Sequence, residues 1–200
     1  VYRLFGGPAR TAVDTYRHAS GGSLEAVEDS VRRYMAEGYR HVRVQVGVPG
    51  LSTYGARGGR RASDIPENAR PDVFEPGPYV RLVPRMFEYL RDKLGDDVEL
   101  LHDVHERVPP ILAMKLAKDV EPYRLFFLED PFSPEDVGYF RHLRQQTATP
   151  IAMGELFNNP NEFVDIIADR LIDFIRVHIS QIGGLTPARK LANFCEFFRV

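Results

Sequence analysis

The chain has 200 residues, of which 44% are apolar, and its formal net charge is -2 at pH 7. This length and apolar content are typical of a globular domain with a sizeable core, and the near-neutral charge does not favour nucleic acid or an anionic membrane as a partner. No stretch reaches the roughly 20 apolar residues of a membrane helix, no signal peptide is recognised, and the one cysteine excludes a disulfide framework. We therefore expect a cytoplasmic enzyme.

Short apolar strands alternate with amphipathic helices along the chain. The patterns predict strands at 11–19, 40–46, 98–103, 124–129, 150–154 and 173–178. They predict helices at 24–37, 79–94, 109–119, 134–146, 160–169 and 186–198. Ser23 is the expected cap of the first helix, and Cys195 in the last helix is more typical of a small core residue than of a nucleophile. A Gly-, Pro- and Arg-rich loop at 47–77 has the length of a lid or binding loop.

Alternating strands and helices predict a parallel sheet with right-handed crossovers. An open doubly wound sheet and a (β/α) barrel both fit this order. We favour the barrel, because three successive strands end in an acidic residue, at the end where barrels carry their active sites. A complete barrel needs eight β/α units over about 250 residues. We therefore expect 1–200 to be a partial (β/α) barrel catalytic domain, from which an N-terminal portion and the last barrel strands are missing.

Three carboxylates recur at a spacing of 26 residues: Asp103, Glu129 and Glu155. They close the apolar runs VELLHD, RLFFLE and TPIAMGE. A buried charge at a strand end is costly unless something offsets it, and Mg²⁺ prefers carboxylate oxygens. Any one of these acids alone is also consistent with a cap of the following helix. The equal spacing of all three favours a shared Mg²⁺ site.

Two neighbours of these acids complete the pattern. His105 lies two residues after Asp103, so on a strand both side chains would point the same way, one toward a metal and the other toward a substrate. A solvated loop histidine is the alternative. Asp130, next to Glu129, is expected to point the other way and to cap a helix or bind an arginine.

The motifs LLHDVHER, FFLEDP, PIAMGELFN and IGGL together resemble the enolase superfamily, and most closely its mannonate dehydratase branch of starvation-sensing-protein type. The resemblance covers essentially the whole chain. It implies an N-terminal α+β capping domain followed by a modified barrel. It also implies metal ligands at the ends of the third, fourth and fifth barrel strands, where Asp103, Glu129 and Glu155 stand.

The resemblance also implies a catalytic base. Many members carry Lys-x-Lys on the second strand, where this chain has Arg43-Val44-Gln45. An arginine cannot easily act as a base, and the branch pairs this arginine with a tyrosine of the following loop, for which Tyr54 is the match. A nearby guanidinium lowers the pKa of a phenol from its usual value of about 10. The alternative is that Arg43 pairs with a carboxylate and Tyr54 is an ordinary loop residue.

The implied reaction is removal of water from D-mannonate, which gives 2-keto-3-deoxy-gluconate. Tyr54, assisted by Arg43, removes the proton next to the carboxylate, Mg²⁺ stabilises the resulting charge, and His105 donates a proton to the departing hydroxyl. His18 and Arg176 are implied to contact the acid-sugar substrate. Two alternatives stay open: dehydration of gluconate or another aldonic acid, and a catalytically weak regulatory homologue that keeps the metal site. Relatives are often multimeric, so a homo-oligomer is expected.

Overall fold

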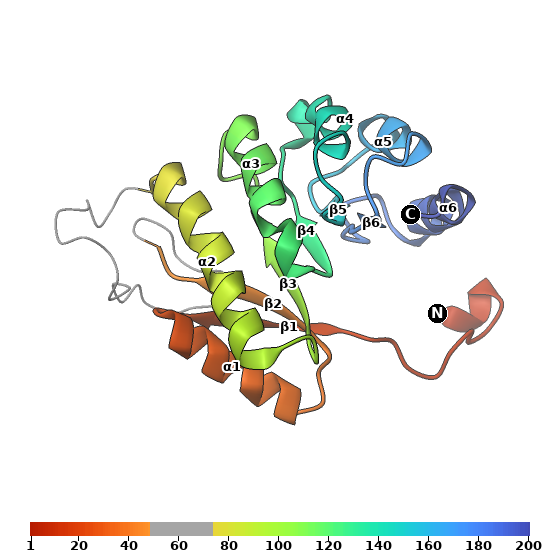
Figure 1. Ribbon diagram of the computed structural model, residues 1–200. Coiled ribbons are helices and arrows are strands. Elements are labelled where there is room, and N and C mark those ends of the chain that lie inside the picture. Colours follow the sequence, from red (N-terminus) through yellow and green to blue (C-terminus); the bar gives the residue numbers. More distant parts are fainter. Residues whose placement is uncertain (49–73) are drawn as a thin grey trace.

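The computed structural model describes residues 1–48 and 74–200 (Figure 1). Its strands form one parallel sheet: β1 (Tyr16–Gly21), β2 (His41–Val46), β3 (Glu99–Asp103), β4 (Phe127–Glu129), β5 (Ile151–Met153) and β6 (Phe174–Ile175). The helices are α1 (Leu24–Ala36), α2 (Pro76–Leu94), α3 (Pro110–Val120), α4 (Tyr139–Arg144), α5 (Val164–Ala168) and α6 (Leu185–Phe198). Short 3-10 turns are η1 (Tyr2–Phe5), η2 (Glu121–Tyr123), η3 (Pro134–Asp136) and η4 (Pro160–Glu162).

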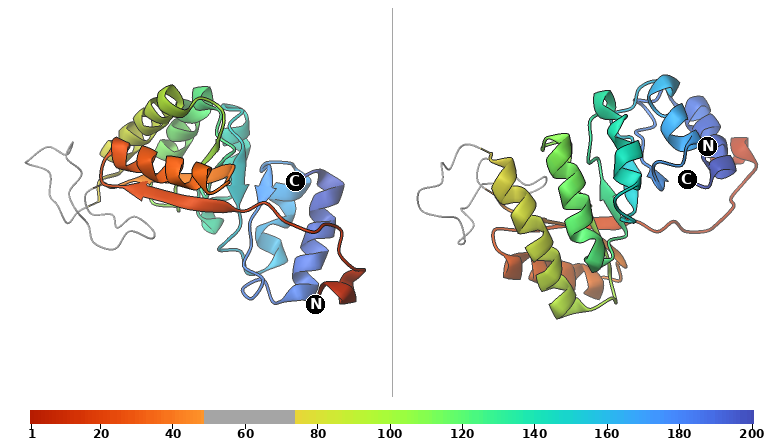
Figure 2. Two further views of the ribbon diagram at one scale, coloured as in Figure 1. Left: turned by 90° about the horizontal axis from the view of Figure 1, so that it is seen from below. Right: turned by 45° about the horizontal axis from the view of Figure 1, so that its top comes forward.

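The order of the strands decides between the two expected architectures. Each strand pairs in parallel with the next one in sequence, from β1 to β6. Right-handed crossovers that always advance in one direction put the connecting helices on one face, and α1 to α5 lie there in Figures 1 and 2. A doubly wound sheet would reverse direction at a switch point. The described strands therefore have (β/α)-barrel order, and the expected fold class is confirmed.

The element boundaries differ from expectation mainly where the strands are short. β1 begins at Tyr16 rather than at 11, and the last strand covers two residues rather than 173–178. The helix expected at 134–146 is divided into η3 and α4 near Gly138, a poor helix former. The helix expected at 160–169 is divided at Phe163, whose φ of -124° is not helical. The Ser23 cap is confirmed, because Ser23 Oγ accepts the Ala26 N–H at 3.2 Å.

The sheet has two different faces. On the helix-covered face, Val42, Val44, Leu100, Leu128 and Ile151 join the main hydrophobic core. On the other face, a separate cluster forms the interior of the barrel sheet. Its members are Tyr16, Leu101, Phe127, Ala152 and Phe174, with Phe126. Because side chains alternate along a strand, the residue two positions further on points to the same face. His18, Asp103, Glu129 and Arg176 stand two positions after Tyr16, Leu101, Phe127 and Phe174, and are therefore expected to point to the interior face as well.

A buried hydrogen-bond chain joins α2 to the sheet on its outer face. The Tyr79 hydroxyl lies 2.7 Å from His102 Nε2, and His102 Nδ1 lies 2.8 Å from the Val44 carbonyl oxygen. A carbonyl only accepts, so Nδ1 donates to Val44 and Nε2 accepts from Tyr79. Burial lowers the pKa of His102 to about 4, which keeps the ring neutral. These two hydrogen bonds fix the ring of His102, the residue immediately before Asp103.

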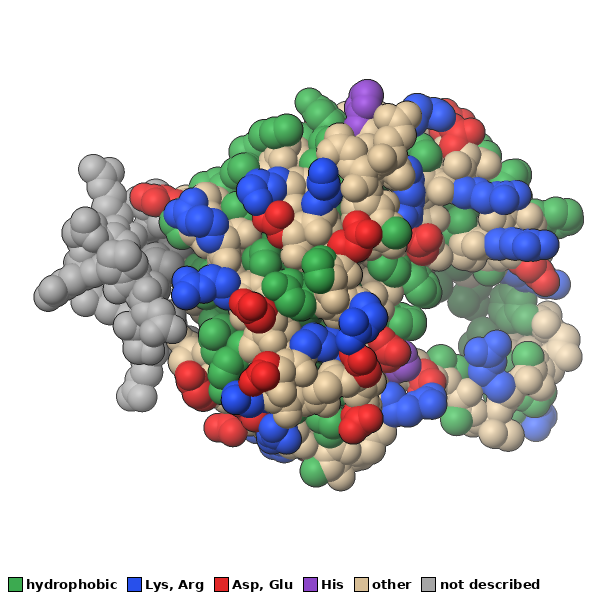
Figure 3. Space-filling model, in the orientation of Figure 1, with side chains coloured by type: hydrophobic (Ala, Val, Ile, Leu, Met, Phe, Trp, Pro, Cys, Tyr) green, Lys and Arg blue, Asp and Glu red, His purple; other side chains and the backbone are tan. Residues whose placement is uncertain are grey.

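The surface of the described residues is mixed in charge. Figure 3 shows Lys and Arg side chains interspersed with Asp and Glu over one face. Among the described residues, no helix has the length and apolar character needed to cross a membrane. The N-terminal η1 lies near α6 rather than beside β1, with the Arg189 guanidinium 5.4 Å from the centre of the Phe5 ring (Figures 1 and 2).

We predict that Tyr79→Phe lowers the free energy of unfolding by about 1–3 kcal/mol, because it leaves the buried His102 Nε2 without a donor. Denaturant unfolding followed by circular dichroism measures the loss. Tyr139→Phe removes the same atom from a side chain that is 41% exposed and should change stability by less than about 0.5 kcal/mol. Equal losses in the two variants would contradict the role given to the Tyr79 hydroxyl.

Candidate active site

Polar side chains gather on the interior face, at the carboxyl ends of the strands. Asp103 and Glu129 are the last residues of β3 and β4 and are direct cross-strand partners. His18 and Arg43 are partners in the same way on β1 and β2. Asp103 is 3% exposed and Glu129 is 0% exposed, so neither charge is stabilised by bulk water.

Two guanidinium groups connect the three predicted acids. Arg43 Nη1 lies 2.8 Å from Asp103 Oδ2 and 3.9 Å from Glu129 Oε2. Arg176 pairs with Glu129 Oε1 and lies 3.2 Å from Glu155 Oε2. Arg43 thus does pair with a carboxylate, as in the alternative that the sequence left open, and Arg176 pairs with two. Glu129 is held between the two arginines.

His105 connects the remaining two acids. Its Nδ1 lies 3.4 Å from Asp103 Oδ2 and 3.2 Å from Glu155 Oε1. Contact with Asp103 raises the pKa of His105. Burial alone would raise the pKa of Asp103, but His105 and the Arg43 charge outweigh burial and hold it below its ordinary value. Each pair among the three acids therefore shares one basic group.

His105 reaches this position from a turn and not from a strand. β3 ends at Asp103, and both His105 and Glu106 have left-handed backbones, with φ of 54° and 57°. This conformation is uncommon outside glycine and is found at functional sites. The Glu106 N–H donates to the Asp130 carbonyl oxygen at 3.0 Å and holds the turn against the end of β4. The expectation that strand alternation aims His105 was wrong, although the two side chains do meet.

Asp130 also corrects the sequence prediction, since it does not point away from the other acids. Its carboxylate lies within 4.8 Å of ligand atoms of Asp103 and His105, and likewise of Glu129 and Glu155. Its φ of 43° turns the backbone out of the strand, so alternation no longer sets its direction. The acidic pair Glu129-Asp130 was the only signal in the sequence for this role.

The surroundings of Asp130 disfavour its charge. Asp130 Oδ1 accepts the Gly154 N–H at 3.4 Å, whereas Oδ2 has no hydrogen-bond partner among the described residues. Burial, followed by the charges of Asp103 and Glu155, raises the pKa of Asp130 to about 8. Burial likewise raises the pKa of the neighbouring Glu106 to about 7.

The donor set fits a divalent cation. Several buried carboxylate oxygens accept no hydrogen bond from the described residues, among them Asp103 Oδ1, Glu129 Oε2 and Asp130 Oδ2. Buried carboxylate oxygens without donors are costly, and they are the ligands that hard divalent cations prefer. Asp130 belongs to both groups of potential ligands, Asp103–His105–Asp130 and Glu129–Asp130–Glu155.

The other predicted site residues fall into two groups. His18 Nδ1 lies 3.3 Å from Arg43 Nη2, and burial, followed by the Arg43 charge, lowers the pKa of His18 to about 4. His18 is thus neutral on the same interior face. Tyr54 and most of the loop expected at 47–77 lie outside the described residues. His178, which the sequence did not single out, brings its Nε2 to 3.9 Å from Glu155 Oε2.

A carboxylate-lined interior at the carboxyl ends of parallel β/α strands defines a barrel-type enzyme site. Comparison with known families agrees with this class. The family described as "Enolase C-terminal domain-like" matches residues 26–200. The chain belongs to this family.

Curated relatives are identical to the chain at nearly half of the aligned positions. A D-galactonate dehydratase family member of Enterocloster bolteae is 48% identical over 100% of this chain and 49% of its own length. One from Musicola paradisiaca is 48% identical over 98% of this chain and 50% of its own length. The chain thus spans about half the length of the curated relatives that it matches.

Solved structures agree with the fold. The crystal structure of an enolase from Pantoea ananatis with bound D-gluconate and Mg has a TM-score of 0.91 and 47% identity, and covers 100% of this chain and 51% of that one. A mandelate racemase/muconate lactonizing enzyme from a Sulfitobacter species has a TM-score of 0.80 at 21% identity, over 100% of this chain and 48% of its own. The second likeness bears on the fold alone.

We predict that Asp130→Asn raises the stability of the metal-free protein at pH 8 by about 1 kcal/mol or more, because a pKa difference of one between the folded and unfolded states corresponds to about 1.36 kcal/mol. The pKa of folded Asp130, about 8, lies above the ordinary value of 3.8, so wild-type stability should fall as pH rises from about 4 through 8. The variant should lose less over this range. Thermal unfolding in chelator at several pH values measures the difference.

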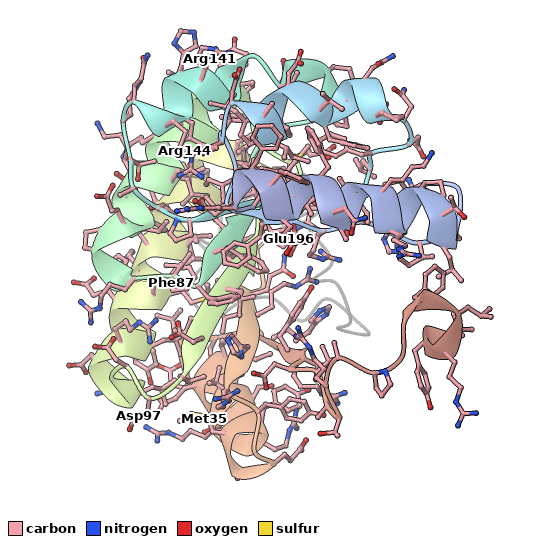
Figure 4. All side chains as sticks on the ribbon, turned by 90° about the vertical axis from the view of Figure 1, so that its right-hand side faces the viewer. Met35, Phe87, Asp97, Arg141, Arg144 and Glu196 are labelled. Carbon is pink, nitrogen blue, oxygen red and sulfur yellow. The ribbon has the colours of Figure 1, made fainter. Side chains whose placement is uncertain are left out.

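The exposed Asp97, six residues before Asp103 and labelled in Figure 4, provides the control. Asp97→Asn should follow the wild-type pH profile. Identical profiles of stability against pH for the wild type and both variants would show that the pKa of Asp130 is not raised in the folded protein.

Proposed function

We propose that the protein to which this chain belongs dehydrates acid sugars at this site with the help of Mg²⁺. The observation that supports this most is the linked set of Asp103, Glu129 and Glu155, in which each pair shares a basic group. The names of the relatives, and the D-gluconate and Mg in the Pantoea ananatis enolase, point the same way.

Asp103, Glu129 and Glu155 are proposed to hold the Mg²⁺, with Asp130 beside them. When bound, the ion supplies positive charge that stabilises negative charge developing next to a substrate carboxylate. Its presence would also offset the mutual repulsion of these buried acids, which the two arginines and His105 offset only in part.

The other residues have separate tasks in this proposal. His105 has a raised pKa and is placed to donate a proton to the leaving hydroxyl group. Tyr54 takes the proton next to the carboxylate, and Arg43, held by Asp103, favours the ionised phenol. Arg176, with its fixed fork of donors, and the neutral His18 contact the acid sugar.

The particular acid sugar is a finer question. The likeness of the motifs to the mannonate dehydratase branch makes D-mannonate the first candidate, with 2-keto-3-deoxy-gluconate as its product. The relatives are named for D-galactonate, and the solved enolase holds D-gluconate. We therefore propose D-mannonate as the substrate to test first, beside the other two.

We predict that the full-length protein, supplied with Mg²⁺, converts at least one of D-mannonate, D-gluconate and D-galactonate into a 2-keto-3-deoxy acid. His105→Asn and Tyr54→Phe should each lower kcat about 10²–10⁴-fold, the usual contribution of a positioned acid or base. Asp97→Asn, at the amino end of β3, should leave kcat unchanged. Product formation, measured by a colorimetric assay for 2-keto acids, gives these values.

Full activity in either variant would remove the role assigned to that residue. Tight Mg²⁺ and acid-sugar binding without any turnover by the wild type would instead favour a regulatory homologue that has kept the site.

A further inference from the structure

Gln45 has a buried amide that none of the roles above explains. It is the residue before the end of β2 and is 5% exposed. Its Nε2 atom has no hydrogen-bond partner among the described residues. A buried donor left unpaired lowers stability, and such groups in native proteins call for an explanation.

The strand geometry aims this amide into the barrel interior. Gln45 follows Arg43 by two residues on the same strand, so the two side chains share a face. The Arg43 guanidinium identifies that face as the interior one, because it contacts Asp103 and His18. Gln45 lies further toward the carboxyl end of β2, which is the end where the acids gather.

The register gives its neighbours. Gln45 pairs with Ser20 on β1, and Arg43 pairs with Leu101 on β3. The same register continued by two residues places Gln45 opposite Asp103. The amide therefore stands at the level of the acids, on the strand next to them.

Asp103 and Glu155 each have basic partners, whereas the Gln45 amide nitrogen has no partner among the described residues. Asp103 has Arg43 and His105 as partners, while Glu155 has Arg176. An amide does not ionise near neutral pH, so Gln45 can donate a hydrogen bond there without adding charge to the site. In native proteins, buried donors without a protein partner are found mainly at functional sites, where a ligand can supply the acceptor.

We propose that Gln45 is a substrate-binding residue whose Nε2–H donates a hydrogen bond to a hydroxyl or carboxylate oxygen of the acid sugar. This assignment rests on the proposed function and extends it to a residue on β2 that does not ionise. It gives Gln45 a role in binding and orientation, and no part in proton transfer.

The test compares Gln45→Met, which keeps the length of the side chain but removes the amide, with the wild-type full-length protein. Calorimetric titration of D-gluconate and D-mannonate into the Mg²⁺-loaded proteins should show about a tenfold or larger loss of affinity, as expected for one lost hydrogen bond to a ligand. Affinity for Mg²⁺ alone should change less than about twofold. The Tm without sugar should stay equal or rise, because an unpaired buried donor has been removed.

Two further variants sharpen the result. Gln45→Glu keeps the shape and loses the donor, so it should also bind the sugar more weakly. Gln146→Met changes an exposed glutamine just after α4 and should behave as wild type.

The outcomes separate the two proposals. A wild type that binds no acid sugar would overturn the proposed function and this assignment with it. A wild type that binds, together with a Gln45→Met variant of equal sugar affinity, would overturn only the assignment of Gln45. A lowered Tm with unchanged sugar affinity would show that Gln45 is a structural residue.

Discussion

The burial of several carboxylates at one place is the constraint on which this structure depends. Asp103 and Glu129 have almost no contact with water, and a charge in such surroundings persists only beside opposite charge. Arg43, Arg176 and His105 supply that charge, each between two acids. Removing one basic group would leave two acids with one basic partner each, and less of their mutual repulsion would be offset. The polar layer is therefore one coupled unit rather than a set of separate ion pairs.

The fold makes this unit possible by bringing strand ends together in sequence order. Because β3 and β4 are neighbours in register, Asp103 and Glu129 face each other across one ladder. The apolar cluster that includes Leu101 and Phe127 forms the floor below them and keeps water out from that side. Past the strand ends, the left-handed backbone at His105 brings its ring back over the acids. The sheet thus sets where the acidic residues stand, and the turns after the strands set where the following side chains point.

The sequence predicted the features that depend on the periodicity and order of the strands and helices. It failed for side chains whose direction is set by a turn. Alternating β/α patterns indicated the parallel fold, and the equal spacing of Asp103, Glu129 and Glu155 indicated that they lie at equivalent strand ends. The predicted direction of the Asp130 side chain was wrong, because strand alternation does not extend to a residue with φ of 43°. That Gln45 Nε2 has no hydrogen-bond partner among the described residues could not be predicted, since the partners of a donor on one strand come from other strands. Tyr54 lies outside the described residues, so its role stays a prediction.

The central claim is that the three evenly spaced acids act together on one divalent cation. Calorimetric titration of Mg²⁺ into the full-length wild type and into Asp103→Asn, Glu129→Gln and Glu155→Gln tests it most directly. We predict one Mg²⁺ site in the wild type, with binding severely weakened by each single substitution and with losses that do not simply add when two are combined, because groups that hold one ion are coupled. A variant that binds Mg²⁺ as tightly as the wild type would contradict this claim.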